Sequence, residues 1–178
     1  MDNLKQLLLQ ELMSDETIEI WDPHEHKYFG ASTRTLSFFG DVNYDRSRLL
    51  ISQLLHLEEL DDVEPIKIFL NTEGGSLTDG LAIYDAITNL SCPVIVVATG
   101  ICASAGLLIL TAADYKIATS NTVFYYHQPV ISDSRVCSRQ EIESLSEHYL
   151  YCQSTTDEII RKKNRITKAV WNKNFLNK

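Results

Sequence analysis

Short apolar runs alternate with amphipathic stretches through the middle of the chain. Each run is three to five residues long and is typical of a β-strand. These runs lie at residues 35–39, 66–70, 93–97, 115–118 and 123–125. Apolar side chains recur at helical spacing over Arg48–Leu60 and Thr78–Leu90, and a third helix is predicted after Ser104. Strands that alternate with helices predict an α/β fold with a parallel sheet and right-handed crossovers.

Two further helices are predicted outside this alternating region. The leucine spacing of Leu4–Leu12 indicates an amphipathic helix that docks on its own core or on a neighbouring subunit. The long polar stretch Gln140–Lys163 has isolated apolar positions and indicates one helix, or a broken one, projecting from the body. Because so polar a helix gains little stability by itself, we expect it to pack against another subunit.

Composition narrows the possible functions without identifying one. The chain has 178 residues, of which 44% are hydrophobic and 22% charged, and one globular domain is expected. Its net charge is −8, and it lacks the basic patch that nucleic-acid binding requires. No signal peptide or membrane span is evident, so a reducing cytoplasmic compartment is expected. The cysteines fit no zinc pattern, and Cys92 and Cys102 are expected to be small core residues.

A serine at a predicted strand-to-helix junction is the first candidate for chemistry. Ser104 lies in the small-residue segment Gly100–Gly106, where a substrate carbonyl could approach and free N–H groups could stabilise negative charge. His127 follows the last predicted strand. Taken alone, each has a simpler structural explanation. Ser104 would be a small residue at a tight helix start, and His127 a hydrogen-bonded histidine at a strand end.

Position in the predicted sheet links these residues to a glycine turn. Gly74 and Gly75 follow the second predicted strand, and the carboxyl ends of parallel strands share the edge where ligands bind. Acyl transfer requires a nucleophile, a base and donors for the oxyanion. Ser104 and His127 would supply the first two, and the backbone N–H groups of Gly75 and Ala105 would supply the donors. Together these features favour a serine peptidase.

Three ordered segments resemble the proteolytic subunit of the Clp protease, ClpP. Asn71–Asp85 is similar to the family's glycine-turn segment, Gly100–Gly106 to its nucleophile motif and His127–Pro129 to its histidine motif. Arg34–Val42 also resembles the family's first strand and turn. The resemblance covers roughly residues 34–130 and continues weakly through the predicted long helix.

The resemblance implies a single ClpP-like serine peptidase domain over residues 1–178, with a crotonase-like fold of repeated β-β-α units. Residues 1–33 would be a divergent N-terminal segment, and about 138–165 a protruding, handle-like helix. Carried over to this chain, Ser104 is the nucleophile and His127 the general base. Gly75 and Ala105 would form the oxyanion hole through their backbone N–H groups.

The same resemblance implies how such a protein assembles and with what. Members form homo-oligomeric, heptameric or stacked rings around a chamber in which unfolded polypeptides are cut. An AAA+ Clp-type unfoldase threads the substrate and spends ATP, and this chain has no P-loop of its own, so no cofactor is expected in it. The cytoplasm or the plastid stroma would be the compartment, with no nucleic-acid or membrane partner.

Several positions depart from the family pattern. Glu73 stands where the family's glycine turn usually has proline, which places a charge beside the cleft. Val130–Cys137 replaces a glycine-rich segment that helps to align substrate and join rings. Asp133 and Asp157 are available carboxylates, but neither lies at the position of the family's triad aspartate.

That late triad aspartate has no counterpart near the end of the sequence. Either the sequence given is cut short, or an asparagine orients the histidine, or Ser104 and His127 act as a pair. The candidate asparagines are Asn172, Asn174 and Asn177. Loss of the orienting carboxylate can cost about 10⁴-fold in rate while the geometry stays intact.

The remaining histidines and tyrosines have structural explanations. His24 and His26 could share one face of a strand, but no third ligand follows at suitable spacing, so no metal site is predicted. His56 and His148 are expected at helix surfaces. Tyr125 and Tyr126 are expected in the core or at a subunit interface, with a hydrophobic substrate groove as the lesser alternative.

Two other functions stay open on the sequence alone. The missing carboxylate suggests a catalytically weak or inactive ring subunit that regulates a mixed assembly. A crotonase-like acyl-CoA enzyme would use the same backbone oxyanion device, but such enzymes take carboxylates as acid and base, which makes it the more distant alternative.

Overall fold

The structure is a computed structural model that describes residues 21–22, 27–28, 34–130 and 138–176. The chain divides into two units, Met1–Thr33 and Arg34–Lys178. In the first unit, β1 (Trp21–Asp22) and β2 (Lys27–Tyr28) pair as antiparallel strands. The helix predicted over 4–12 lies outside the described residues.

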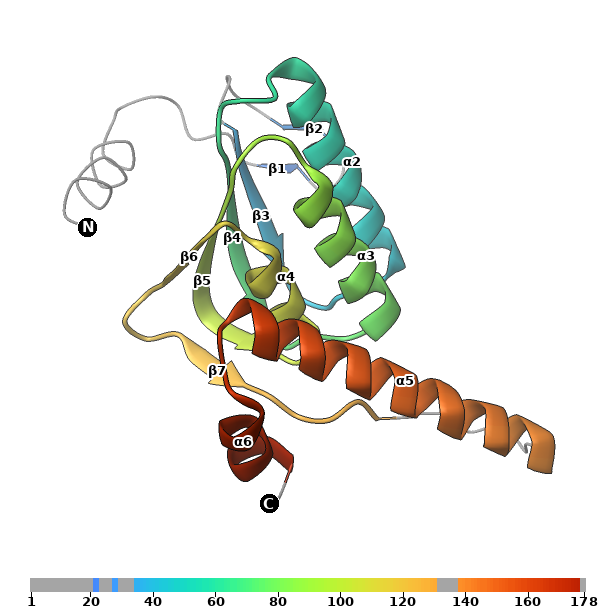
Figure 1. Ribbon diagram of the computed structural model, residues 1–178. Coiled ribbons are helices and arrows are strands. Elements are labelled where there is room, and N and C mark those ends of the chain that lie inside the picture. Colours follow the sequence, from blue (N-terminus) through green and yellow to red (C-terminus); the bar gives the residue numbers. More distant parts are fainter. Residues whose placement is uncertain (1–20, 23–26, 29–33, 131–137, 177–178) are drawn as a thin grey trace. The chain divides into compact units, whose positions relative to one another are not determined.

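The second unit is built on a parallel β-sheet (Figure 1). The strand order is β3-β4-β5-β6, and β7 pairs with the later part of β5. Each of these pairings is parallel, which confirms the predicted α/β arrangement. The strands are β3 (Thr35–Phe39), β4 (Ile66–Thr72), β5 (Val94–Ala103), β6 (Tyr115–Ala118) and β7 (Val123–Tyr125).

The central strand β5 corrects the sequence prediction, because it continues well beyond the expected 93–97. Gly100 takes a φ of +61° and bends the strand, and the register between β4 and β5 shifts nearby. The Asn71 Oδ1 of β4 accepts a hydrogen bond from the Ile101 N–H at 3.1 Å, so a side chain replaces a ladder bond there. The strand therefore runs on to Ala103, first beside β6 and then beside β7.

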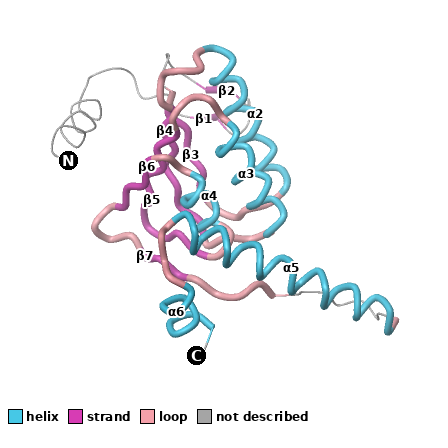
Figure 2. The backbone as a smooth tube through the Cα atoms, in the orientation of Figure 1, coloured by secondary structure: helices cyan, strands magenta, loops and turns pink. Residues whose placement is uncertain are grey.

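Three helices connect the strands and lie on one side of the sheet (Figures 1 and 2). They are α2 (Tyr44–Leu60), α3 (Leu77–Asn89) and α4 (Gly106–Ala112). Helix α2 begins before the predicted Arg48, because the side chain of Asn43 caps it by accepting a hydrogen bond from the Arg46 N–H. Ser76 caps α3 in the same way.

The core lies between these helices and the sheet. Cys92 and Cys102 are buried free thiols, as predicted, and burial raises the pKa of Cys102 to about 12. That thiol therefore stays protonated and serves as packing. The fully buried side chains of the strands and helices include Leu54, Ile66, Ile68, Leu70, Ile83, Val94, Val96 and Ile109.

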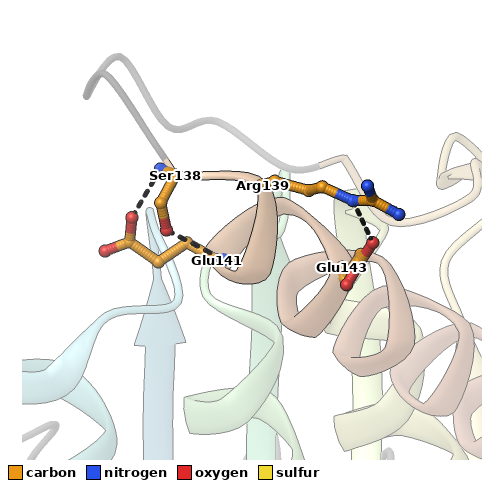
Figure 3. A network of polar contacts seen from close by, with 4 residues as sticks. All are labelled: Ser138, Arg139, Glu141 and Glu143. Atoms are coloured by element: carbon orange, nitrogen blue, oxygen red, sulfur yellow. Dashed lines mark hydrogen bonds and ion pairs between the residues drawn. The ribbon is translucent and has the colours of Figure 1, made fainter.

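Helix α5 (Arg139–Lys163) is one uninterrupted helix, so the alternative of a broken helix is wrong. A capping box closes its first turn (Figure 3). The Ser138 Oγ accepts a hydrogen bond from the Glu141 N–H at 3.3 Å, and the Glu141 carboxylate accepts one from the Ser138 N–H at 2.7 Å. An exposed ion pair joins Arg139 to Glu143 beside it.

Only the later half of α5 contains buried side chains. Its buried side chains are Cys152, Thr156 and Ile160, and in Figure 1 the earlier turns extend away from the sheet. The chain then forms the short helix α6 (Lys168–Trp171) and the π-helical turn η1 (Asn172–Leu176). Within the part of the chain that the structure describes, no helix is long and apolar enough to cross a membrane.

Candidate active site

The three predicted segments meet at the carboxyl ends of neighbouring strands. Gly74 and Gly75 follow β4, Ser104 follows β5 directly, and His127 lies shortly beyond the end of β7. Because β5 pairs with both β4 and β7, the three segments lie at one edge of the sheet. The loop containing Ser104 is therefore flanked by the other two.

The glycine turn is packed too tightly to accept a side chain. Gly74 and Gly75 have φ values of +102° and +144°, which L-residues rarely adopt. A Cβ on Gly75 would lie 2.3 Å from the carbonyl oxygen of Val42. Hydrogen bonds from the Val42 N–H to the Gly74 oxygen and from the Ser76 N–H to the Val42 oxygen, both 2.8 Å, fix the turn on that side.

On its other side, the turn contacts the loop of Ser104. A Cβ built on Gly74 would lie 2.5 Å from the Cβ of Ser104, 2.8 Å from the oxygen of Ala103 and 3.0 Å from the nitrogen of Ala105. Gly106 is equally close to β4, since a Cβ there would lie 2.4 Å from the Cγ2 of Thr72. Glycine on both segments is what allows the two backbones to approach.

Ser104 itself has an unusual backbone conformation. Its φ of +51° is in the left-handed region, which is uncommon for residues other than glycine and costs conformational energy. The side chain is partly exposed, and the Ser104 N–H donates a hydrogen bond to the carbonyl oxygen of Tyr125 at 3.0 Å. Such strain occurs at functional sites more often than elsewhere, and here it is held in place by packing on Gly74 and pairing with β7.

Two backbone N–H groups beside Ser104 have no hydrogen-bond acceptor among the described residues. They belong to Gly75 and Ala105, the predicted oxyanion donors. Ala105 is 2% exposed, and buried backbone donors are rarely left unpaired. A Cβ built on Gly74 would lie 3.0 Å from the Ala105 nitrogen, so the glycine turn and the Ser104 loop are in close contact. This arrangement suits the stabilisation of an oxyanion.

His127 is exposed and has a defined ring orientation. Its Nδ1 lies 2.7 Å from the carbonyl oxygen of Gln128, and its ring centroid is 5.9 Å from that of Tyr125. A carbonyl oxygen can only accept, so Nδ1 must carry the proton and Nε2 keeps a free lone pair in the neutral ring. That tautomer is the one a general base requires. The hydrogen bonds of the described residues do not include one between Ser104 and His127.

The same fold and motifs occur in a known family. The sequence profile of the Clp protease family matches residues 28–175, which is most of the chain. The chain belongs to the Clp protease family. This assignment confirms the resemblance seen in the sequence and the fold class that it implied.

Individual Clp protease relatives show moderate identity. An ATP-dependent Clp protease proteolytic subunit from Cyanophora paradoxa is 32% identical over 126 residues, which cover 70% of this chain and 64% of that protein. Proteolytic subunit 2 from Treponema denticola is 32% identical over 115 residues, 64% of this chain and 58% of that protein. The match thus spans somewhat less than two thirds of the length of these relatives.

A solved structure supports the fold assignment. A point mutant of ClpP1 from Listeria monocytogenes superimposes on this chain with a TM-score of 0.71 and 30% sequence identity. The superposition covers 79% of this chain and 77% of that one. The glycine turn, the Ser104 loop and β7 therefore lie on a sheet of the Clp protease type.

None of the described candidates for a third triad member is hydrogen-bonded to His127. The side chain of Asn174 donates instead to the carbonyl oxygen of Val170 at 2.9 Å, and Asn172 ends helix α6. Asp157 accepts a hydrogen bond from the hydroxyl of Tyr126. The other candidates, Asn177 and Asp133, lie outside the described residues.

The structure places several of the remaining histidines and charged residues that the sequence singled out. Among the described residues, no group of three or more histidine, cysteine or acidic side chains could hold a metal ion. His56 and His148 are exposed on α2 and α5, as predicted. His24 and His26 lie outside the described residues. Glu73 is exposed at the start of the glycine turn, so its charge faces solvent.

Sequence reasoning missed the aromatic contacts beside His127. Tyr126 packs edge to face on Trp171 at 5.0 Å and on Phe175 at 5.3 Å, and those two rings lie 4.6 Å apart. We call Tyr126, Trp171 and Phe175 the aromatic clamp. The spacing of Trp171 and Phe175 marks one face of a C-terminal helix, but only the fold shows that this face meets the residue before His127.

Proposed function

We propose that this protein is a serine endopeptidase subunit that hydrolyses peptide bonds of unfolded polypeptides. The observation that carries the proposal is the Ser104 loop. A left-handed serine packs against Gly74, and the unpaired N–H groups of Gly75 and Ala105 lie beside it. A residue kept only for packing would need neither the backbone strain nor an unpaired N–H on the buried Ala105 beside it.

The proposed reaction is acyl transfer to Ser104. The Oγ of Ser104 attacks the scissile carbonyl while Nε2 of His127 takes its proton and later returns it to the leaving amine. The N–H groups of Gly75 and Ala105 stabilise the oxyanion, and water then hydrolyses the acyl-enzyme. Support for His127 as the base comes from its tautomer and from the hydrogen bond between Ser104 and Tyr125, which brings the two loops together.

Assembly and a partner complete the proposed function. As for the family, we propose a homo-oligomeric ring, heptameric or stacked, with an AAA+ Clp-type unfoldase that supplies unfolded substrate. That partner would spend the ATP, and this chain would need no cofactor. The hydrogen bond between Ser104 and His127 would form on assembly or substrate binding, since catalytic hydrogen bonds often tighten only in the complex.

A fluorophosphonate probe tests the catalytic proposal. The wild-type protein is expected to be labelled at one serine, and labelling should vanish in Ser104→Ala. Ser120→Ala, which removes an exposed hydroxyl from a turn, is the matched control and should label like the wild type. If the wild type never labels, whether alone, assembled or mixed with an unfoldase, the proposal of catalysis is wrong.

A non-catalytic ring subunit is the second candidate. It is favoured by the lack of a hydrogen bond between Ser104 and His127, and of a carboxylate on His127, among the described residues. In that case the protein would not label, but it would change the peptidase rate of a partner ring when mixed with it. Mass measurement of the mixture would then show both chains in one particle.

A further inference from the structure

One side chain, Tyr126, anchors the loop that carries His127. The imidazole of His127 is exposed, whereas Tyr126 is partly buried. The Tyr126 hydroxyl donates a hydrogen bond to the Oδ1 of Asp157 on α5, and its ring meets Trp171 of α6 and Phe175 of η1. Contacts from three C-terminal elements therefore converge on the residue next to the proposed base.

The aromatic clamp also touches the helix that follows the nucleophile. Trp171 is 3% exposed and packs with Leu108 of α4 and Ile160 of α5, and Tyr126 packs against the same cluster. Helix α4 begins at Gly106, directly after the Ser104 loop. One packed group thus holds both the segment with His127 and the helix behind Ser104. It constrains the distance between the proposed nucleophile and base.

The hydrogen bond between Tyr126 and Asp157 is suited to holding the loop of His127 in place. Burial raises the pKa of the Tyr126 phenol, and so do the hydrogen bond and the charge of Asp157, with a smaller contribution from Tyr149. The hydroxyl therefore keeps its proton and donates a hydrogen bond to the carboxyl group of Asp157. The hydrogen bonds of the described residues do not join Asp157 to His127, so Asp157 is not placed to orient the imidazole directly.

We propose that Tyr126 and Asp157 are positioning residues that hold the loop of His127 so that Nε2 faces Ser104. The inference rests on the proposed peptidase function. Asp157 acts through the phenol of Tyr126 and is not a third triad member. The ring itself is oriented by the carbonyl of Gln128 at Nδ1. Because Gln128 belongs to the same loop, the orientation of the ring depends on the loop that Tyr126 holds.

Kinetics of hydroxyl and carboxylate variants test the proposal. In Tyr126→Phe and Asp157→Ala, kcat for a fluorogenic peptide should fall between about 10- and 100-fold, because a displacement of about 1 Å has that cost. KM should change by less than about twofold, since the loss concerns the transition state. Asp157→Asn keeps an acceptor oxygen and should restore most of the rate.

Matched controls remove the same groups from the outer face of α5. Tyr151→Phe removes a hydroxyl from a side chain that is 67% exposed, and Glu158→Gln removes an exposed charge that pairs with solvent-exposed Lys162. Both should keep kcat within about twofold of the wild type, as is usual for exposed sites. Circular dichroism and urea unfolding give the folded fraction of each variant. A loss of kcat that equals the unfolded fraction would overturn the proposal.

Ring-nitrogen NMR of His127 gives a readout that does not need activity. The Nδ1–H tautomer bound to Gln128 should dominate in the wild type and the controls, and should decrease in Tyr126→Phe. If the wild type fails to label with fluorophosphonate, the proposed function fails, while this tautomer change still supports the positioning role. An unchanged kcat together with an unchanged tautomer in folded Tyr126→Phe would overturn it.

Discussion

The two halves of the candidate site are built in different ways. The nucleophile half is held by backbone contacts: Gly74 and Gly106 leave no room for a Cβ against their neighbours, and Ser104 is hydrogen-bonded to β7 through its main chain. The histidine half is held by side chains, chiefly the hydroxyl and ring of Tyr126. Backbone contacts tolerate almost no substitution, whereas side-chain contacts can be weakened in steps.

This difference bears on how His127 is held, since no carboxylate of the described residues is hydrogen-bonded to it. An oxyanion site needs fixed backbone donors from the start, because their advantage comes from not reorganising during the reaction. A general base has to accept and return a proton. The position of its loop can be set by side chains of other elements that pack on that loop. In this chain α5, α6 and η1 pack there, which couples the histidine loop to elements that are distant from it in the sequence.

The largest effect is expected for Gly74→Ala in the nucleophile half. A methyl group there would lie 2.5 Å from the Cβ of Ser104 and 2.8 Å from the oxygen of Ala103, and the residue would keep a φ of +102°. Relief requires the Ser104 loop to move, so fluorophosphonate labelling should slow by about 100-fold or more. The measurement is the second-order labelling rate on protein that is folded by circular dichroism.

Gly40→Ala is the matched control for that variant. Gly40 has a similar φ of +91°, but its Cβ would meet only the end of the flexible Arg46 side chain, at 2.8 Å. Both variants therefore strain the backbone. Gly74→Ala must also displace the Ser104 loop, whereas Gly40→Ala must displace the end of the Arg46 side chain. If Gly40→Ala slows labelling as much as Gly74→Ala does, strain alone explains the loss and the close packing at Ser104 is not the cause.

A smaller effect on activity is expected for Trp171→Ala in the histidine half. The change removes a side chain that is 3% exposed, so it should lower the free energy of unfolding by about 3 kcal/mol. Because Tyr126 loses one ring contact but keeps Asp157, kcat should fall by only about 10-fold. Urea unfolding and peptide kinetics measure the two effects separately.

Val170→Ala is the neighbouring control, since Val170 is 49% exposed on the same short helix. It should change the free energy of unfolding by less than about 0.5 kcal/mol, as surface substitutions do. Equal losses for both variants would mean that α6 as a whole, and not the ring of Trp171, supports the histidine loop. Helix α6, and not the aromatic clamp, would then be what holds the histidine half of the site.

The sequence predicted the nucleophile half better than the histidine half, for a physical reason. Glycine marks tight turns and close approaches of the backbone, so the segments of Gly74, Gly75 and Ser104 could be placed from local pattern and sheet topology together. The extension of β5 was missed because Gly100 interrupts its apolar run, and the side chain of Asn71 that compensates comes from another strand. When a side chain replaces a backbone hydrogen bond in this way, the pattern of apolar residues in the sequence does not reveal it.

The histidine half depends on contacts between residues that are far apart in the sequence. Tyr126 and Asp157 both looked ordinary, one as a core tyrosine and the other as a spare carboxylate, because neither has a local partner. Their hydrogen bond follows from the path of α5 past the end of β7, which periodicity does not give. The start of α5, in contrast, lies within one residue of the predicted Gln140, and the structure shows that Ser138 and Glu141 cap it there.

The smallest effect is expected for Ser138→Ala, which removes that cap from the part of α5 that extends away from the sheet (Figure 3). Loss of an N-cap serine should cost about 1 kcal/mol of local helix stability, seen as faster amide exchange in the first turns. Ser146→Ala, at an exposed position within the helix, is the control and should be neutral or slightly stabilising. The buried half of α5, with Asp157 and Ile160, should keep its protection, so kcat per assembled particle should match the wild type. If kcat instead falls as far as in Trp171→Ala, the whole of α5 responds as one unit, and the histidine is coupled to the distant end of that helix as well as to the aromatic clamp.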